Sequence, residues 1–365
     1  MVDPMTEQSP AVNIMDDDVW NDFCDQLKNA GRVILREKSP DNELDRAEGW
    51  RYLTRLTRLA FEQYLEHNDA CAPTLYRLSH ETAKIGCDNP DSYYQNAMID
   101  GRYQYRISGT RGTVQYLGLG TYSGCYGQGN VIEPTGYVDG RELQVDEDGS
   151  LEITLSTTPV EGNWLKMRED SSLLVIRQFR QDWENDEVAR LTIERIGQPN
   201  VPELLSAQRL VEGLNSAARF VEGTAAVFAD WAEDFKATPN ALRYKPIEEG
   251  SGLGDPNNLF WHGYWNIGPD QALVIEATPP QCETWNFQLN NYWEESLDYR
   301  YHNVTINKHS AKYEADGSVR IVIAHRDPGF GNWMETVGHH QGTMGLRWTG
   351  ASHQVTPEAR VITLD

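Results

Sequence analysis

Hydrophobic residues follow a helical pattern near the N-terminus. Apolar positions recur every three or four residues over 19–34 and, after a Ser-Pro breaker, again over 53–64. This spacing puts the apolar side chains on one face of a helix, and proline ends a helix. We therefore predict a helical hairpin within residues 16–80, preceded by a disordered tail at residues 1–15.

The pattern then changes to short alternating runs separated by glycine, which is typical of strands with one buried face. Such runs occupy residues 103–107, 113–120, 151–155 and 173–179, and later 272–277, 283–289, 319–324 and 343–348. Helical spacing returns between the two groups, over residues 205–235. The pattern predicts a first β module at 86–197, a helical connector at 198–240 and a second β module at 250–350.

The two β regions repeat one another. Asp316 stands 168 positions after Asp148, and the residues around both are Asp-Gly-Ser followed by an alternating run. The pairs Asn163-Trp164 and Asn332-Trp333 recur in register, and so do Arg177 and Arg347. Self-similarity at a fixed offset indicates duplicated structural units. The expected fold is mainly β with helical segments, built from two related β-sandwich or jelly-roll-like modules with equal strand orders.

The block WNFQLNNYWEESLDYR at 285–300 and the block with HRDPG, NW, GH and RW at 325–348 resemble the bacterial family catalogued as domain of unknown function 1214. The run DNPD at 88–91 and YRISGTRG at 105–112 are similar to the amino-terminal half of the same longer proteins. The resemblance implies a jelly-roll-like β domain and a bacterial origin. It implies no reaction.

Charge and composition limit the classes of molecule that this protein is expected to bind. The net charge is −23, and such a field repels nucleic acid and anionic membrane surfaces. No apolar run is long enough to cross a bilayer, and the acidic N-terminus lacks a signal core. The five cysteines include no CxxC pair, which suits a reducing compartment. We expect a cytoplasmic protein that binds a small molecule and, because so many aromatic residues leave apolar surface exposed, a homo-oligomer.

The candidate catalytic residues lie mostly near the C-terminus. Seven of nine histidines lie between His262 and His353, and only the second repeat contains this enrichment. His325 and Asp327 are two apart at a strand end, and His339 and His340 follow in a glycine-flanked loop where positioning residues are often found. Imidazole can transfer protons near neutral pH. Three interpretations stay open for these residues: metal-free acid–base chemistry, a non-haem metal site made of His325, Asp327 and His339, or turn capping.

The segment before them supplies further candidates. Acidic and aromatic residues alternate around Trp293, so that Glu294 and Asp298 are candidates for carboxyl groups whose pKa is raised by desolvation. Asn286 and Gln288 share one strand face, and such an amide row suits a hydroxyl-rich ligand or a wet surface. We also expect Arg347 among the binding residues, although it equally fits a strand-end scaffold.

A second aromatic cluster contains Trp261, His262 and Tyr264, which could line an apolar pocket or belong to the core. The chain contains no GxSxG and no glycine-rich phosphate loop, and no cysteine stands next to a histidine in sequence. The leading hypothesis is therefore a metal-free acid–base site, without a cofactor, for a bulky and partly apolar small molecule. The alternative is a non-catalytic β-sandwich protein that binds a glycan or metabolite.

Overall fold

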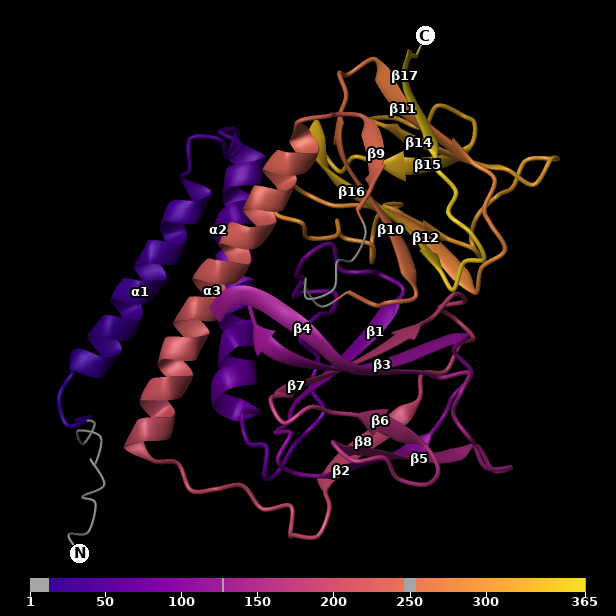
Figure 1. Cartoon of the computed structure of the whole chain (residues 1–365). Helices are drawn as coiled ribbons and strands as arrows, with labels where there is room; N and C mark the ends of the chain where they lie inside the picture. Colours follow the sequence, from indigo (N-terminus) through magenta and orange to yellow (C-terminus); the bar gives the residue numbers. More distant parts are fainter. Residues whose placement is uncertain (1–12, 127, 246–253, 365) are drawn as a thin grey trace, which may run out of the picture.

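The structure is a computed structural model that describes residues 13–126, 128–245 and 254–364. A layer of helices runs along one side of two β modules stacked end to end (Figure 1). Residues 1–12 of the predicted tail lie outside the described residues. Within the described ranges, none of the helices is both long and apolar enough to span a membrane.

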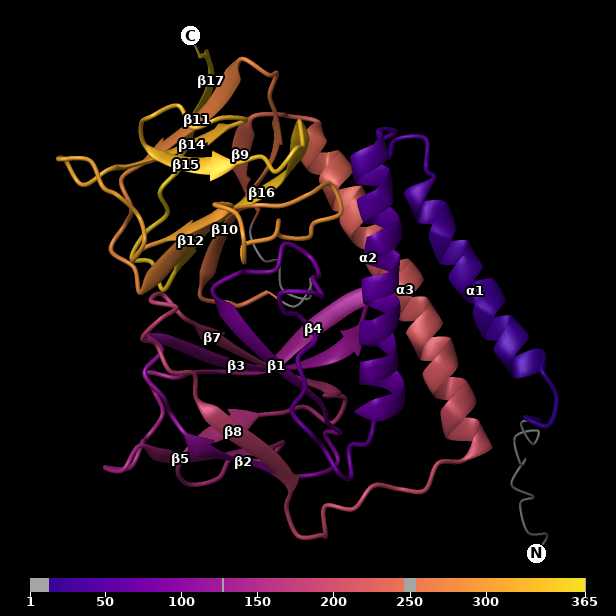
Figure 2. The same ribbon diagram turned by 180° about the vertical axis from the view of Figure 1, so that it is seen from behind.

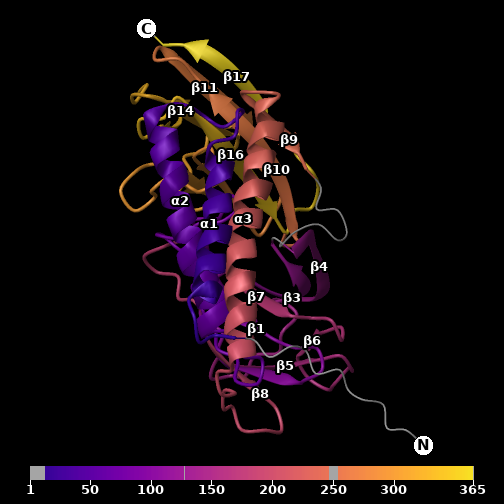
Figure 3. The same cartoon turned by 90° about the vertical axis from the view of Figure 1, so that its left-hand side faces the viewer.

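The helix layer contains three long helices packed side by side (Figure 3). They are α1 (Asp18–Ile34), α2 (Glu43–Phe61), which continues into the π-helical turn η1 (Glu62–Glu66), and α3 (Ala207–Lys236). The side chain of Asn42 accepts a hydrogen bond from the first turn of α2, and Ser206 does the same for α3, as N-cap residues do. The 30 residues of α3 span about 45 Å at 1.5 Å per residue, so one helix reaches both modules.

The first module is a sandwich of two four-stranded sheets, ordered β1-β7-β3-β4 and β6-β5-β2-β8. Its strands are β1 (Ser92–Met98), β2 (Tyr105–Thr110), β3 (Tyr116–Cys125), β4 (Gln128–Asp139), β5 (Ser150–Ser156), β6 (Trp164–Lys166), β7 (Leu173–Phe179) and β8 (Arg190–Arg195). Aliphatic side chains from both sheets, such as Ile107, Leu119 and Ile176, form one core between them.

The second module repeats this arrangement, with sheets ordered β10-β16-β12-β13 and β15-β14-β11-β17. Its strands are β10 (Asn258–Asn266), β11 (Gln271–Ala277), β12 (Thr284–Leu289), β13 (Thr305–Asn307), β14 (Val319–Ala324), β15 (Asn332–Glu335), β16 (Gln341–Thr349) and β17 (Glu358–Thr363), and β9 (Ala241–Tyr244) lies beside β10. Strand β17 extends the module past residue 350, where the alternating pattern used for the sequence prediction ends.

The predicted repeat is confirmed, because the two modules have the same strand order when β1–β8 are matched with β10–β17. The Asn-Trp pairs stand at equivalent places, at the start of the short parallel strands β6 and β15. Asn163 donates hydrogen bonds to two backbone carbonyls that brace its strand, and Asn332 does the same. These pairs are therefore scaffold, which explains their presence in both copies.

The two modules face each other through the sheets that contain β7 and β16 (Figure 2). Polar groups connect them: Arg347 donates to the backbone carbonyl of Cys87, Gln288 donates to that of Asp88 at 2.6 Å, and Asn307 donates to Asp91 at 3.0 Å. A buried polar interface needs every donor and acceptor satisfied, since an unpaired buried polar group costs free energy. A buried polar atom in this interface that has no hydrogen-bond partner therefore needs an explanation other than packing.

Helix α2 packs closely against the second module at Gly49. A Cβ added at Gly49 would come within 2.6 Å of the Trp293 ring and 3.0 Å of Ile34. We expect Gly49→Ala to lower the free energy of unfolding by about 1–3 kcal/mol through overpacking, despite the better helix propensity of alanine. Urea denaturation measures this change.

Gly31→Ala in α1 is the matched control. Its added Cβ would meet only the edge of the Trp50 ring at 3.3 Å, and Trp50 is 43% exposed and free to shift. This variant should be neutral or slightly stabilised. Equal destabilisation of both variants would contradict the role assigned to Gly49.

Candidate metal centre

The C-terminal histidines predicted as a catalytic group do not converge with Asp327. His325, at the end of β14, contacts the Thr336 hydroxyl at 2.9 Å through Nδ1, and its ring lies 5.0 Å from that of His340. The exposed Asp327 carboxylate accepts a hydrogen bond from Gly329 N at 2.8 Å and so caps a turn. The His325 and His340 rings contact each other, but the Asp327 carboxylate caps a turn. Turn capping is the third of the interpretations left open by the sequence.

His339 turns away from this pair and contacts α2. Its Nε2 lies 2.8 Å from the Glu48 carboxylate and 3.9 Å from Asp45. Burial alone would lower the pKa of His339, but the hydrogen bond and charge of Glu48 more than offset it, so that the pKa is raised. His339 is an anchor between α2 and the second module. Among the described residues, His325, Asp327 and His339 therefore form no cluster of metal ligands.

The prediction of a raised pKa for Asp298 is wrong. Its carboxylate pairs with Arg300 at 2.7 Å, and this hydrogen bond is the main reason why its pKa falls to about 2. Trp293 is a buried packing residue whose ring nitrogen donates to the Asp45 carbonyl at 2.7 Å. Trp261 packs in the core of the second sandwich, and Tyr264 packs in the helical core.

The predicted amide row holds Arg347. Asn286 and Gln288 are buried, and Arg347 Nη1 donates to their side-chain oxygens at 3.3 and 2.8 Å. Amides occupied in this way lie inside the module interface and do not present a wet face. The observation that motivated a glycan-binding surface therefore has another explanation.

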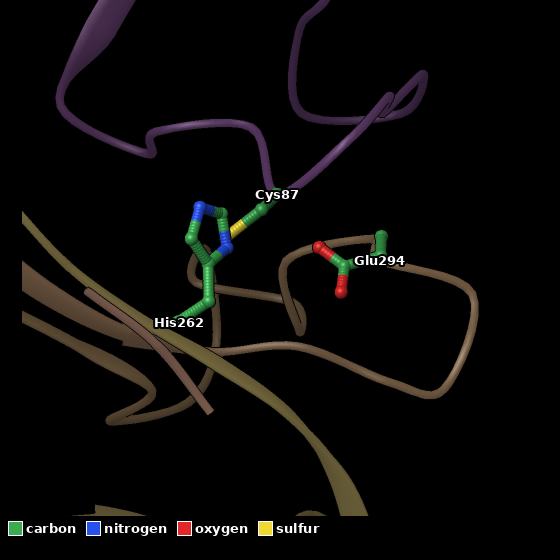
Figure 4. A group of neighbouring side chains, drawn as sticks. All are labelled: Cys87, His262 and Glu294. Atoms are coloured by element: carbon green, nitrogen blue, oxygen red, sulfur yellow. The ribbon is translucent and has the colours of Figure 1, made fainter. Parts of the chain in front are cut away.

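Cys87, His262 and Glu294 lie together between the two modules (Figure 4), and rings of α3 pack against His262. Cys87 comes from the segment before β1, His262 from β10 and Glu294 from the loop between β12 and β13. One sulfur, one imidazole nitrogen and one carboxylate oxygen all lie within 4.8 Å of one another. The three residues are 1%, 3% and 0% exposed. We call this group the Cys87–His262–Glu294 centre.

The centre contains buried polar atoms without partners. Both carboxyl oxygens of Glu294 and Nδ1 of His262 have no hydrogen-bond partner of normal geometry among the described residues. Nδ1 is on the edge of the ring that faces the Cys87 sulfur (Figure 4). Because buried polar groups are nearly always paired, three such atoms in one small group of side chains indicate that the site is shaped for something not supplied by these side chains.

Burial shifts the pKa of each of the three groups toward its neutral form. Burial raises the pKa of Glu294 to about 8, as predicted, although Thr343, Arg347 and Lys245 act in the opposite direction. Burial also raises the pKa of the Cys87 thiol to about 12. The pKa of His262 falls well below its usual range because of burial and the charge of Arg347. A cation placed among these groups would reverse the first two shifts.

Hydrogen bonds outside the centre orient its members. Asn290 Nδ2 donates to the Cys87 sulfur at 3.1 Å, and the Cys87 backbone N–H donates to the Glu294 carbonyl at 2.7 Å. Cys87 and Glu294 both have left-handed backbones, with φ of 56° and 59°. Each such residue costs about 1–3 kcal/mol and persists where the surrounding structure imposes it. The scaffold thus holds two unfavourable backbones to bring these side chains together.

Within the described parts of the two modules, the first module has no counterpart of the centre. Arg177 pairs with Tyr94 across β7 and β1, and its counterpart Arg347 pairs with Phe260 across β16 and β10. Tyr94 on β1 therefore corresponds to Phe260 on β10. Two residues after each of them, Asn96 corresponds to His262. Both modules keep the same strands and the strand arginine, but the imidazole that could bind a ligand occurs in the second module. This difference indicates a local function for this side chain.

Cys87 was not among the residues predicted from the sequence. No histidine stands next to it in the chain, and His262 is 175 positions away. The repeat contained a usable signal, since aligning Asp88 with Asp255 places Cys87 opposite Gly254. His262, Glu294 and Arg347 were among the predicted residues, but as members of separate groups.

Comparison with known families identifies the class of protein. The family described as protein of unknown function DUF1214 matches residues 94–181 and 269–352, one match in each β module. The chain belongs to this family. No curated protein matches the chain.

Two solved structures show how widely the architecture is shared. An uncharacterized protein from Burkholderia cenocepacia is 46% identical over 95% of this chain and 97% of its own, with a TM-score of 0.93. The VPA0106 protein from Vibrio parahaemolyticus is 12% identical over 93% of this chain and 100% of its own, with a TM-score of 0.51. The first shares the whole arrangement, and the second shares the fold alone.

Proposed function

We propose that the Cys87–His262–Glu294 centre binds one divalent transition-metal ion of the zinc type and that the ion's remaining position binds a small molecule. The observation that carries the proposal is spacing. The three donor atoms lie within 4.8 Å of one another, yet no hydrogen bond joins any two of these side chains in the described structure. Ligands about a tetrahedral zinc ion are separated by about 3.2–3.7 Å, given metal–ligand distances of about 2.0–2.3 Å.

The donor set suits such an ion. Thiolate, imidazole and carboxylate are the three ligand types that zinc takes from proteins, and sites with three protein ligands keep a fourth position for water or substrate. Charge supports the same conclusion, because a divalent cation is neutralised by one thiolate and one carboxylate. The hydrogen bond from Asn290 to the sulfur is the kind of outer contact that orients a ligand.

A metal-free catalytic triad fits the geometry less well. A thiol nucleophile and its imidazole base are normally joined by a hydrogen bond of about 2.6–3.2 Å, and the base is oriented by a bonded third group. The raised pKa of Cys87 and the lowered pKa of His262 both oppose a thiolate–imidazolium pair. An ion held here would supply the kind of acid–base chemistry predicted from the sequence, because a metal-bound water can act as a base near neutral pH.

Metal content and cobalt substitution test the proposal. We expect the protein purified under reducing conditions to bind one Co²⁺ per chain and to show a near-ultraviolet sulfur-to-cobalt charge-transfer band. Cys87→Ser should remove the band and weaken binding by at least about 100-fold, since even the loss of an outer-shell contact costs about 10–100-fold. Equilibrium dialysis with elemental analysis measures stoichiometry and affinity.

Two variants serve as controls. Cys282→Ser removes a partly buried thiol outside the centre and should leave the band unchanged. His325→Ala removes a ligand of the alternative metal site and should also have no effect. The proposal is overturned if wild-type protein binds no stoichiometric ion, or if His325→Ala loses the ion while Cys87→Ser keeps it.

A further inference from the structure

We infer that the small molecule bound at the metal is a carboxylate with an apolar body; this inference rests on the proposed function. Two cations near the centre carry the argument. Among the described residues, neither Arg347 nor Lys245 lies within ion-pair distance of a carboxylate, although Arg347 is only 5% exposed. Buried charges are normally paired, so an unpaired guanidinium beside a metal site leaves positive charge to be balanced.

Two further acidic groups near the centre each have a basic residue beside them. Arg55 pairs with Glu295 at 2.5 Å. Asp88 is held by the backbone and hydroxyl of Ser296 at 3.0 and 2.8 Å, and among nearby charges Lys84 acts on it most strongly. Once thiolate and carboxylate have neutralised a divalent ion, neither Arg347 nor Lys245 has an ion-pair partner among the described residues, and an anionic ligand at the open position would supply one.

Aromatic rings form the surroundings of the imidazole. The His262 ring lies 4.9 Å from Phe235, 5.7 Å from Trp231 and 3.6 Å from Phe260, measured between ring centroids. The Arg347 guanidinium lies 4.0 Å from the Phe260 ring centroid. Aromatic surroundings of this kind favour a ligand with an apolar or aromatic part beside its charged group.

Lys245 stands on the more accessible side of this group. Its ammonium lies 4.1 Å from the Trp231 ring centroid and 5.4 Å from that of Phe235. Lys245, Trp231 and Phe260 are partly exposed, whereas Phe235 and His262 are buried. A carboxylate that reached the ion past these three partly exposed residues would have an ammonium beside its charge and aromatic faces beside its apolar part. Lys245 is therefore inferred to be a binding residue for the anion.

Titration of the cobalt-loaded protein with benzoate and with benzamide tests the inference. The two probes have nearly the same shape and differ in charge. We expect benzoate to change the cobalt visible spectrum and to bind at least about tenfold more tightly than benzamide, which corresponds to about 1.4 kcal/mol. Calorimetry measures the two affinities.

Lys245→Met keeps the apolar stem and removes the charge. This variant should retain cobalt with its sulfur band and bind benzoate about tenfold more weakly. Lys308→Met is the control, because the Lys308 ammonium donates to the backbone carbonyls of Cys282 and Glu283 and not to the centre. Benzoate affinity should be unchanged in it.

The outcomes separate this inference from the proposed function. If wild-type protein binds no cobalt, both fail. If cobalt binds through sulfur but benzoate has no effect, binds no better than benzamide, or binds equally to Lys245→Met, the carboxylate inference fails and the metal centre stands.

Discussion

Replacing Arg347 by methionine is expected to lower the free energy of unfolding of the metal-free protein by about 3–5 kcal/mol. Methionine fills similar space but donates no hydrogen bond, so the Cys87 carbonyl and the Asn286 side-chain oxygen lose their donor inside the module interface, and the Gln288 oxygen keeps only its bond from Asn286 Nδ2. Each buried acceptor left unpaired costs about 1–3 kcal/mol. Urea denaturation in the presence of a chelator measures the change.

Arg320→Met is the matched control on a strand of the same module. Arg320 pairs with Glu276 at 2.6 Å, but both side chains are more than a quarter exposed. Exposed ion pairs are worth about 0–1 kcal/mol, so this variant should be nearly neutral. If Arg347→Met proved as stable as Arg320→Met, the interface would not depend on the guanidinium.

Zinc is expected to stabilise the wild-type protein strongly and Glu294→Met not at all. A ligand that binds only the folded state adds about 4 kcal/mol when its free concentration is 1,000 times its Kd. Without zinc the order reverses, and Glu294→Met should be more stable than wild type by about 1–3 kcal/mol, because it removes two buried oxygens that have no hydrogen bond of normal geometry in the described structure. Denaturation with and without zinc checks both parts.

The left-handed backbone at position 294 does not affect the comparison between glutamate and methionine. Glu294 has φ of 59°, a conformation that costs methionine about as much as glutamate because neither is β-branched. A gain in stability therefore reports on the carboxyl group. If Glu294→Met were less stable than wild type in the chelated state, the carboxyl group would be a structural element of the interface, and the reason to place a cation beside it would be lost.

The fold could be predicted in large part because alternation and repetition are local signals. The runs at 151–155 and 319–324 coincide with β5 and β14, and the Asn-Trp pairs mark β6 and β15. Strand β10 was harder to recognise. Its residues Trp261 to Trp265 are buried on both faces, one against the sandwich core and one against α3 and the first module, so no polar alternation marks it.

The site could be predicted only in pieces, because its members come from distant segments. Glu294 was identified from its aromatic neighbours, which bury it, and His262 from its aromatic cluster. Their meeting with Cys87 depends on how two sheets stack, and nothing in a strand's own sequence encodes which strand faces it across an interface. The clustering of His325, His339 and His340 along the chain was misleading for the same reason, since neighbours in a loop can point to opposite sides.

The position of Cys87 ahead of both sandwiches has a consequence for biosynthesis. During synthesis the first module can pair β1 with β7 while His262 and Glu294 are still to be made, and β10 finds its partner β16 only near the end of the chain. Domains tend to fold as units in the order of their synthesis. The three ligands can therefore assemble only after nearly the whole polypeptide has emerged, so metal acquisition would be a final maturation step, and truncated chains would lack the means to hold an ion.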